Sequence, residues 1–77
     1  MSSTEILEQI GVEGRYIERN FETDQLALRE ADGTIVIGMI PQTLVDQLVD
    51  YGFMDLRDSK YRLTEEGLKR VHAPNKS

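Results

Sequence analysis

The sequence of 77 residues predicts a single domain of the α+β class. Two observations lead to this prediction: runs rich in β-branched residues flank a turn dipeptide, and apolar residues elsewhere recur at helical spacing. The stretches Gln25–Arg29 and Thr34–Ile40, separated by Asp32-Gly33, predict a central β-hairpin. Residues 35–37 are apolar on both faces, so this strand is either covered or has one face that awaits a partner.

An N-terminal helix is predicted over Thr4–Ile10, where apolar residues form a stripe at helical spacing. Ser2 and Glu5 have the spacing of a capping box, in which each side chain accepts a hydrogen bond from the other residue's backbone. The next stretch, Val12–Phe21, fits two structures equally well. It is either a helix that continues past two glycines or a strand around Arg15–Glu18.

An amphipathic helix is predicted from about residue 42 to residue 51. Pro41 stands at its first turn, where the missing N–H costs nothing. Gly52 follows its end, in the place of a glycine with left-handed backbone. The apolar face consists of Leu44, Val45, Leu48 and Val49, followed by Phe53.

The C-terminal third predicts a second hairpin and a closing helix. Phe53–Leu56 and Tyr61–Leu63 are the expected strands, with a polar turn at Arg57–Lys60 between them. Thr64 is the expected cap of a short helix that has acidic residues in its first turn and basic residues in its last. Residues 73–77 are expected to form a disordered tail.

The stretch from residue 42 to residue 71 resembles the C-terminal half of a winged helix-turn-helix domain. The residues that carry the resemblance are Leu44-Val45, Leu48, Gly52-Phe53, Tyr61-Arg62-Leu63-Thr64 and Gly67. It implies a winged-helix-like arrangement: N-terminal helix, central hairpin, amphipathic helix, two-stranded wing and short C-terminal helix. The sequence departs from that superfamily in two respects. A predicted strand precedes Pro41 where the superfamily has a helix, and the helix in the recognition position has no basic residue.

Composition restricts the function further. The chain has a net charge of −5 and no cysteine, which excludes disulfides, thiolate zinc sites and iron–sulfur clusters. The missing cysteine fits a cytoplasmic protein. No apolar run approaches the roughly 20 residues that span a bilayer, so no membrane association is expected. An acidic chain is repelled by phosphate backbones unless a local basic face overrides the global field.

The resemblance implies a set of candidate nucleic-acid contacts. In a winged helix-turn-helix complex the polar face of the recognition helix would meet the major groove, and the wing would approach phosphates. The residues in these positions are Gln42, Thr43, Gln47, Arg57, Lys60 and Arg62. The alternative is a solvated polar face beside a polar hairpin tip.

No catalytic, cofactor or metal site is predicted. His72 is the single histidine, and its place near a helix C-terminus fits an interaction with the helix dipole. Neighbouring acids lack a nearby base, and a chain this small rarely forms a catalytic cleft. The sequence therefore predicts neither an enzyme nor a small-molecule substrate.

Four apolar residues exceed what one short hairpin can bury: Tyr16, Phe21, Val36 and Met39. They either fill the core or form an interface with a protein partner or a second copy. The leading hypothesis is a non-catalytic winged-helix-type interaction module that engages a protein partner or itself. The alternative is a dimeric DNA-binding transcriptional regulator, and a weaker third is an acidic mimic of DNA.

Overall fold

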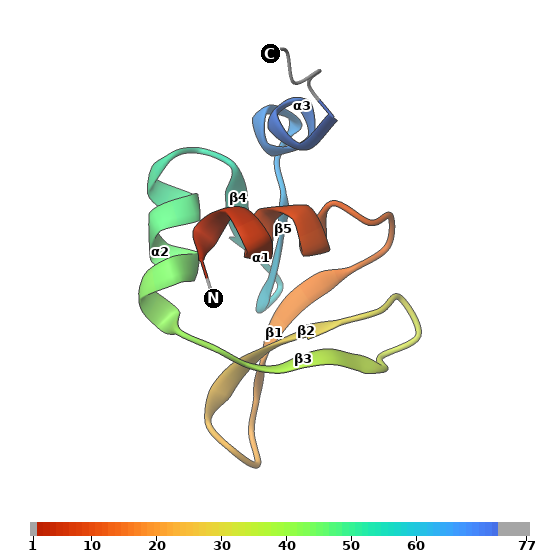
Figure 1. The fold of residues 1–77 in the computed structure, drawn as a ribbon. Coiled ribbons are helices and arrows are strands. Elements are labelled where there is room, and N and C mark those ends of the chain that lie inside the picture. Colours follow the sequence, from red (N-terminus) through yellow and green to blue (C-terminus); the bar gives the residue numbers. More distant parts are fainter. Residues whose placement is uncertain (1, 73–77) are drawn as a thin grey trace.

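A computed structural model describes residues 2–72 and contains three helices beside one five-stranded antiparallel sheet (Figure 1). The α+β class predicted from the sequence is confirmed. The elements in chain order are α1 (Ser3–Ile10), β1 (Tyr16–Asn20), β2 (Gln25–Arg29), β3 (Ile35–Ile40), α2 (Gln42–Asp50), β4 (Met54–Arg57), β5 (Lys60–Leu63) and α3 (Glu65–His72).

The sheet has the strand order β3-β2-β1-β5-β4. It consists of a meander, β1 to β3, and a hairpin, β4 with β5, which are joined where β1 pairs with β5. The stretch Val12–Phe21, for which helix and strand were both open, contains the central strand β1. α1 ends at Ile10 with Gly11 as its C-cap, and Gly14, with φ +89°, stands in the turn that leads into β1.

The predicted central hairpin is confirmed as β2 and β3. Gly33 in its turn has φ +93°, a conformation that glycine adopts without a steric penalty. The Thr34 N–H donates to an Asp32 carboxylate oxygen at 2.9 Å. Hydrogen bonds from Thr34 lower the pKa of the Asp32 carboxyl, because they stabilise its charged form.

The helix ends follow the predicted caps. Ser2 and Glu5 form the capping box of α1, with Ser2 N–H donating to the Glu5 carboxylate at 2.9 Å. The Oγ1 of Thr64 accepts the N–H of Gly67 at 3.1 Å, as predicted for the cap of α3. Pro41 immediately precedes α2 as its N-cap residue, one position earlier than predicted. Gly52, with φ +83°, stands just beyond α2 in left-handed backbone.

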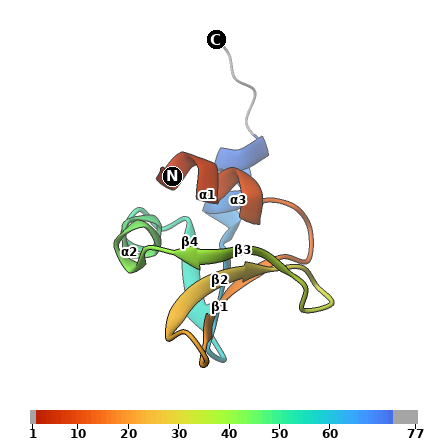
Figure 2. The same cartoon turned by 60° about the horizontal axis from the view of Figure 1, so that its bottom comes forward.

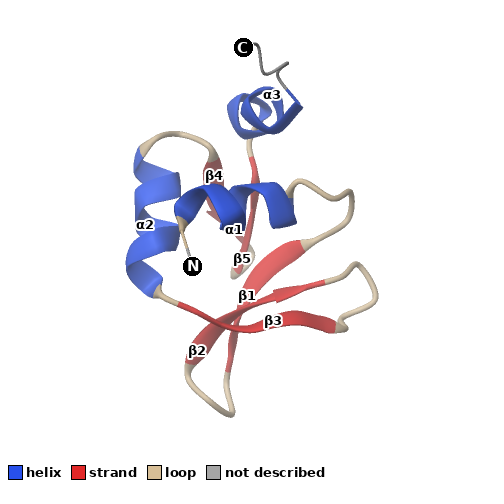
Figure 3. Ribbon diagram, in the orientation of Figure 1, coloured by secondary structure: helices blue, strands red, loops and turns tan. Residues whose placement is uncertain are grey.

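One face of the sheet forms the core with the helices. Its fully buried side chains include Ile17 of β1 and Leu28 of β2, which pack against Ile6 of α1 and Val45 of α2. The three helices gather on one side of the strands, while the β1–β2 hairpin extends away from them (Figure 3). The opposite face of the sheet therefore has no helical layer in the described part of the chain.

The sheet order does not confirm a winged-helix arrangement. The predicted wing is present as the hairpin of β4 and β5, but β5 also pairs with β1 inside a five-stranded sheet. The segment ahead of α2 is the strand β3, as the sequence predicted, where the winged helix-turn-helix superfamily has a helix. None of the helices between residues 2 and 72 is long and apolar enough to cross a membrane. The predicted tail, residues 73–77, lies outside the described residues.

Candidate functional site

The six predicted nucleic-acid contacts divide between two separate regions. Gln42, at the start of α2, is held on the helix side of the sheet. Its Oε1 accepts from Arg19 Nη2 at 2.8 Å, and its Nε2 donates to an Asp46 carboxylate oxygen at 2.9 Å. Thr43 and Gln47 are exposed on the same helix. Both the oxygen and the nitrogen of the Gln42 side-chain amide thus already form hydrogen bonds with other residues of this chain.

The three predicted wing cations lie together on the open face of the sheet. Arg57 and Lys60 are direct cross-strand partners, and Lys60 also faces Glu18 of β1. Direct partners in an antiparallel pair place their side chains on the same face. Since side chains alternate along a strand, Arg62 shares this face with Lys60. The structure therefore brings these cations together but separates them from the Gln42 amide.

Tyr16 lies at the centre of this open face. The Arg62 guanidinium carbon is 5.4 Å from the centre of the Tyr16 ring, and the Lys60 ammonium nitrogen is 5.6 Å from it. On the other side, Arg29 of β2 is the cross-strand partner of Tyr16. We call Tyr16, Arg29, Arg57, Lys60 and Arg62 the basic sheet face. Tyr16, predicted either to fill the core or to form part of a protein interface, is half-buried and lies in this cluster.

Arg29 was not among the predicted site residues. Its Nη1 donates to the Gly33 carbonyl at 2.8 Å, while its Nε is buried with no hydrogen-bond partner in the described structure. The alternation of Leu26, Ala27, Leu28 and Arg29 indicates which residues share a face. It does not indicate that Tyr16 is the neighbour across the strands, because that pairing joins two segments whose register the sequence leaves open.

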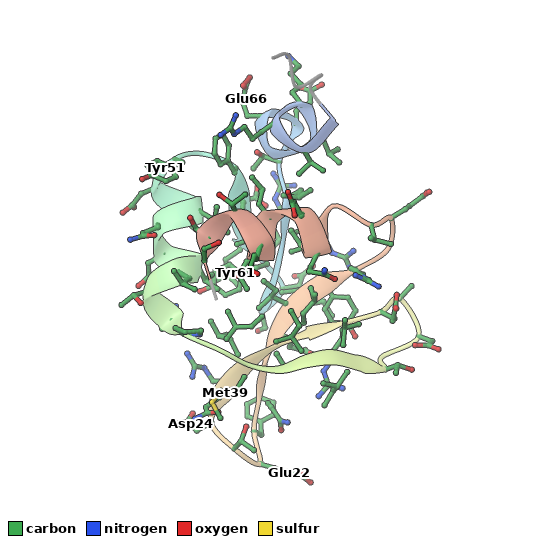
Figure 4. All side chains as sticks on the ribbon, viewed as in Figure 1. Glu22, Asp24, Met39, Tyr51, Tyr61 and Glu66 are labelled. Atoms are coloured by element: carbon green, nitrogen blue, oxygen red, sulfur yellow. The ribbon has the colours of Figure 1, made fainter. Side chains whose placement is uncertain are left out.

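The other predicted interface residues are exposed, and the alternative that they fill the core is wrong for them. The exposed fractions are 91% for Phe21, 61% for Met39 and 36% for Val36. Val36 and Met39 belong to β3, which is the terminal strand of the sheet. Figure 2 shows β3 alongside β2, and Figure 4 shows Met39 near the β1–β2 turn that carries Asp24.

We call the outer side of β3 the β3 edge. Ile35, with 45% of its surface exposed, adds a third apolar side chain to it. Two register irregularities between β2 and β3 bend the strand locally. Within residues 2–72 no further strand pairs with β3 on this side. The β3 edge thus offers backbone hydrogen-bonding groups flanked by exposed apolar side chains.

A shallow depression joins the β3 edge to the β1–β2 turn. Met39, Leu26 and Pro41 line it together with Arg19. The Arg19 guanidinium is held there by the Asp24 carbonyl at 3.0 Å in addition to its bond with Gln42. This arginine therefore stabilises the turn and the start of α2.

No group of three His, Cys, Asp or Glu side chains within residues 2–72 is placed to hold a metal ion. The side chain of His72, for which a dipole interaction was predicted, lies outside the described part of the chain. Comparison with known proteins adds no family: no family model, curated protein or solved structure matches this chain.

Proposed function

We propose that this chain is a non-catalytic interaction module that binds a second polypeptide strand along β3. The partner strand adds to the sheet in antiparallel orientation, so backbone hydrogen bonds supply affinity and the flanking side chains supply selectivity. The first partner that the chemistry favours is β3 of a second copy of this chain.

The observation that carries this proposal is the absence of charge on β3. Its sequence, Ile-Val-Ile-Gly-Met-Ile, contains no ionisable residue and no proline. Each of the other four strands contains at least one charged residue. Natural proteins usually protect an exposed edge with lysine, proline, a β-bulge or a covering element, and of these β3 has register irregularities. Since β3 has neither lysine nor proline and keeps exposed apolar side chains, its edge is suited to pairing.

Charge also selects the partner. Two copies that each carry a net charge of −5 repel one another through most of their surfaces. The uncharged β3 edge is the place where two copies approach without setting like charges side by side. Antiparallel pairing of two β3 strands is two-fold symmetric, so the same patch serves both copies. A chain this small, which buries only about 60–65% of its surface on folding, gains apolar burial from the contact.

Recognition of duplex DNA by α2 is supported less well. Gln42 is engaged by Arg19 and Asp46, and the exposed positions of α2 include two carboxylates, Asp46 and Asp50. These carboxylates would approach phosphate oxygens in a groove. The three cations of the β4–β5 hairpin, Arg57, Lys60 and Arg62, lie on the face of the sheet opposite the helices, so they would not accompany α2 into a groove.

The test is the molar mass of the intact chain in solution. We expect a reversible monomer–dimer equilibrium in sedimentation equilibrium over a wide range of protein concentration. Met39→Lys places a charge in each of the two paired strands, against apolar side chains of the partner strand, and should shift the chain to monomer. This substitution also lowers the net negative charge, so increased overall repulsion cannot explain a loss of pairing.

The matched control is Leu56→Lys on the opposite terminal strand, β4. Leu56 is 55% exposed and Met39 is 61% exposed, so the two changes are similar in chemistry and in burial. The control should pair as the unmodified chain does. A chain that remains monomeric up to about 1 mM, where the pairing free energy is only about −4 kcal/mol, contradicts self-pairing. Loss of the dimer in Leu56→Lys alone would move the contact to β4.

A further inference from the structure

We infer that the basic sheet face binds single-stranded nucleic acid, with an unpaired base on Tyr16 and phosphates on the surrounding cations. This inference does not rest on pairing at β3, because it concerns the face of the sheet and not its edge. It also differs from contact by a recognition helix, since α2 takes no part.

The first observation is the concentration of positive charge on one face of an acidic chain. Four of the nine lysine and arginine residues lie there, on three different strands. Two carboxylates share the face: Glu18 is 3.7 Å from Lys60, and Asp55 is 3.4 Å from Arg57. Cations therefore outnumber carboxylates on this face, while the chain as a whole carries −5. A local excess of this kind attracts anions against the global field.

The second observation is the position of the aromatic ring among these cations. Tyr16 has Arg62 and Lys60 within 5.4 and 5.6 Å of its ring centre, and Arg29 is its partner on β2. Within residues 2–72 Arg62 forms no ion pair with a carboxylate and is exposed, and the side chain of Arg57 is 81% exposed. Arg62 and Arg57 therefore remain accessible to phosphates from solvent, while Lys60 is partly buried beside Glu18.

The form of the surface favours a single strand over a duplex. The face is a stretch of sheet with no helix to enter a groove, as the arrangement in Figure 1 shows. Unpaired bases stack on aromatic rings and on guanidinium planes, whereas the bases of a duplex are already stacked on one another. A half-buried ring bordered by two arginines and a lysine offers both kinds of stacking partner and a charge for the backbone.

The experiment measures the fluorescence anisotropy of 5′-labelled decathymidine as the full chain is added. We expect binding that weakens steeply with salt. If Arg57, Lys60 and Arg62 each neutralise one phosphate, affinity falls about 20-fold between about 50 and 200 mM salt. An unlabelled duplex of the same length should compete at least tenfold less well than unlabelled decathymidine.

Three variants separate stacking from charge. Tyr16→Leu should reduce affinity roughly tenfold, the effect of losing one stacked base, while Tyr16→Phe should retain it. Arg62→Gln should weaken binding several-fold. The slope of log affinity against log salt concentration should also become shallower, by the contribution of roughly one phosphate contact. The matched control is Arg70→Gln on α3, which makes the same change of charge outside the face and should leave affinity within about twofold.

Several outcomes would overturn the inference. Absence of binding to decathymidine and decaadenylate at about 20 mM salt, where phosphate contacts are strongest, removes the site. Equal competition by duplex, or by polyglutamate, shows that negative charge alone is recognised. Equal weakening in Arg70→Gln and Arg62→Gln shows attraction to the whole surface. Tyr16→Phe retains the aromatic ring and removes only the hydroxyl. Failure of this variant to bind would therefore also contradict a stacking role.

Discussion

At the scale of single residues, Gly67 is the position where space and helix propensity oppose each other most directly. Alanine is the better helix former by about 1 kcal/mol, so propensity alone predicts that Gly67→Ala stabilises α3. A Cβ at this position would overlap the carbonyl oxygen of Phe53, which is backbone and cannot rotate away. It would also lie 2.8 Å from a methyl group of Leu63. The steric effect is the larger one.

We therefore expect Gly67→Ala to reduce the free energy of unfolding by roughly 1–3 kcal/mol, the range for overpacking. Urea denaturation followed by circular dichroism measures it. Gly38→Ala is the control, because its Cβ would have no neighbour nearer than 3.9 Å and its backbone needs no left-handed angle. That variant should not lower the free energy of unfolding and should raise it by about 0.5–1 kcal/mol, because glycine within a strand costs that much relative to alanine. A Gly67→Ala chain as stable as the original would show that α3 can move away from Phe53.

At the scale of elements, the hairpin of β4 and β5 has an unusual turn. Asp58 and Ser59 have φ of 53° and 68° between paired Arg57 and Lys60. Two-residue hairpin turns with positive φ at both positions match the twist of the strands, and they favour asparagine followed by glycine. This turn instead places two residues with a Cβ in left-handed backbone, which costs about 1 kcal/mol at a non-glycine position.

Ser59→Gly should consequently raise the free energy of unfolding by about 0.5 kcal/mol, because part of the relief is offset by the greater entropy of glycine in the unfolded chain. The midpoint of thermal unfolding should rise with it. Ser59→Ala, which removes the hydroxyl but retains the Cβ, separates the two causes and should not stabilise the chain. Equal stabilisation by both variants would attribute the effect to the hydroxyl and not to the backbone.

At the scale of the whole molecule, the two proposed surfaces combine in one geometry. Antiparallel pairing of β3 with β3 would join two five-stranded sheets edge to edge. The symmetry axis of such a pair is perpendicular to the sheet, and direct partners share a face. Both basic sheet faces would therefore lie on the same side of the dimer, opposite the helices, and a longer single strand would contact both.

The two proposals predict opposite responses to salt. Self-pairing brings together two chains of charge −5, so screening should strengthen it. Oligonucleotide binding depends on counterion release and should weaken as salt rises. Sedimentation and anisotropy measured over the same series, from about 50 to 500 mM salt, distinguish them. If both affinities change in the same direction, one of the two surfaces has been assigned the wrong kind of partner.

Local pattern determined most of the elements of this protein. Helical spacing and caps predicted α1, α2 and α3, and the Asp32-Gly33 turn predicted the hairpin of β2 and β3. These features depend on residues that are near in sequence, so the sequence itself specifies them. The same reasoning left residues 12–21 open, because Gly11 and Gly14 weaken a helix without specifying a strand.

The tertiary structure alone decided how the elements pair. The placement of β1 between β2 and β5 results from long-range hydrogen bonds that no local pattern contains. That placement leaves β3 at an edge and sets Tyr16 between Arg29 and Arg62. The sequence by itself therefore determined the elements, the acidic balance and the exposed candidates. Which residues became neighbours, and hence where a partner can bind, was decided by strand order and register across the sheet.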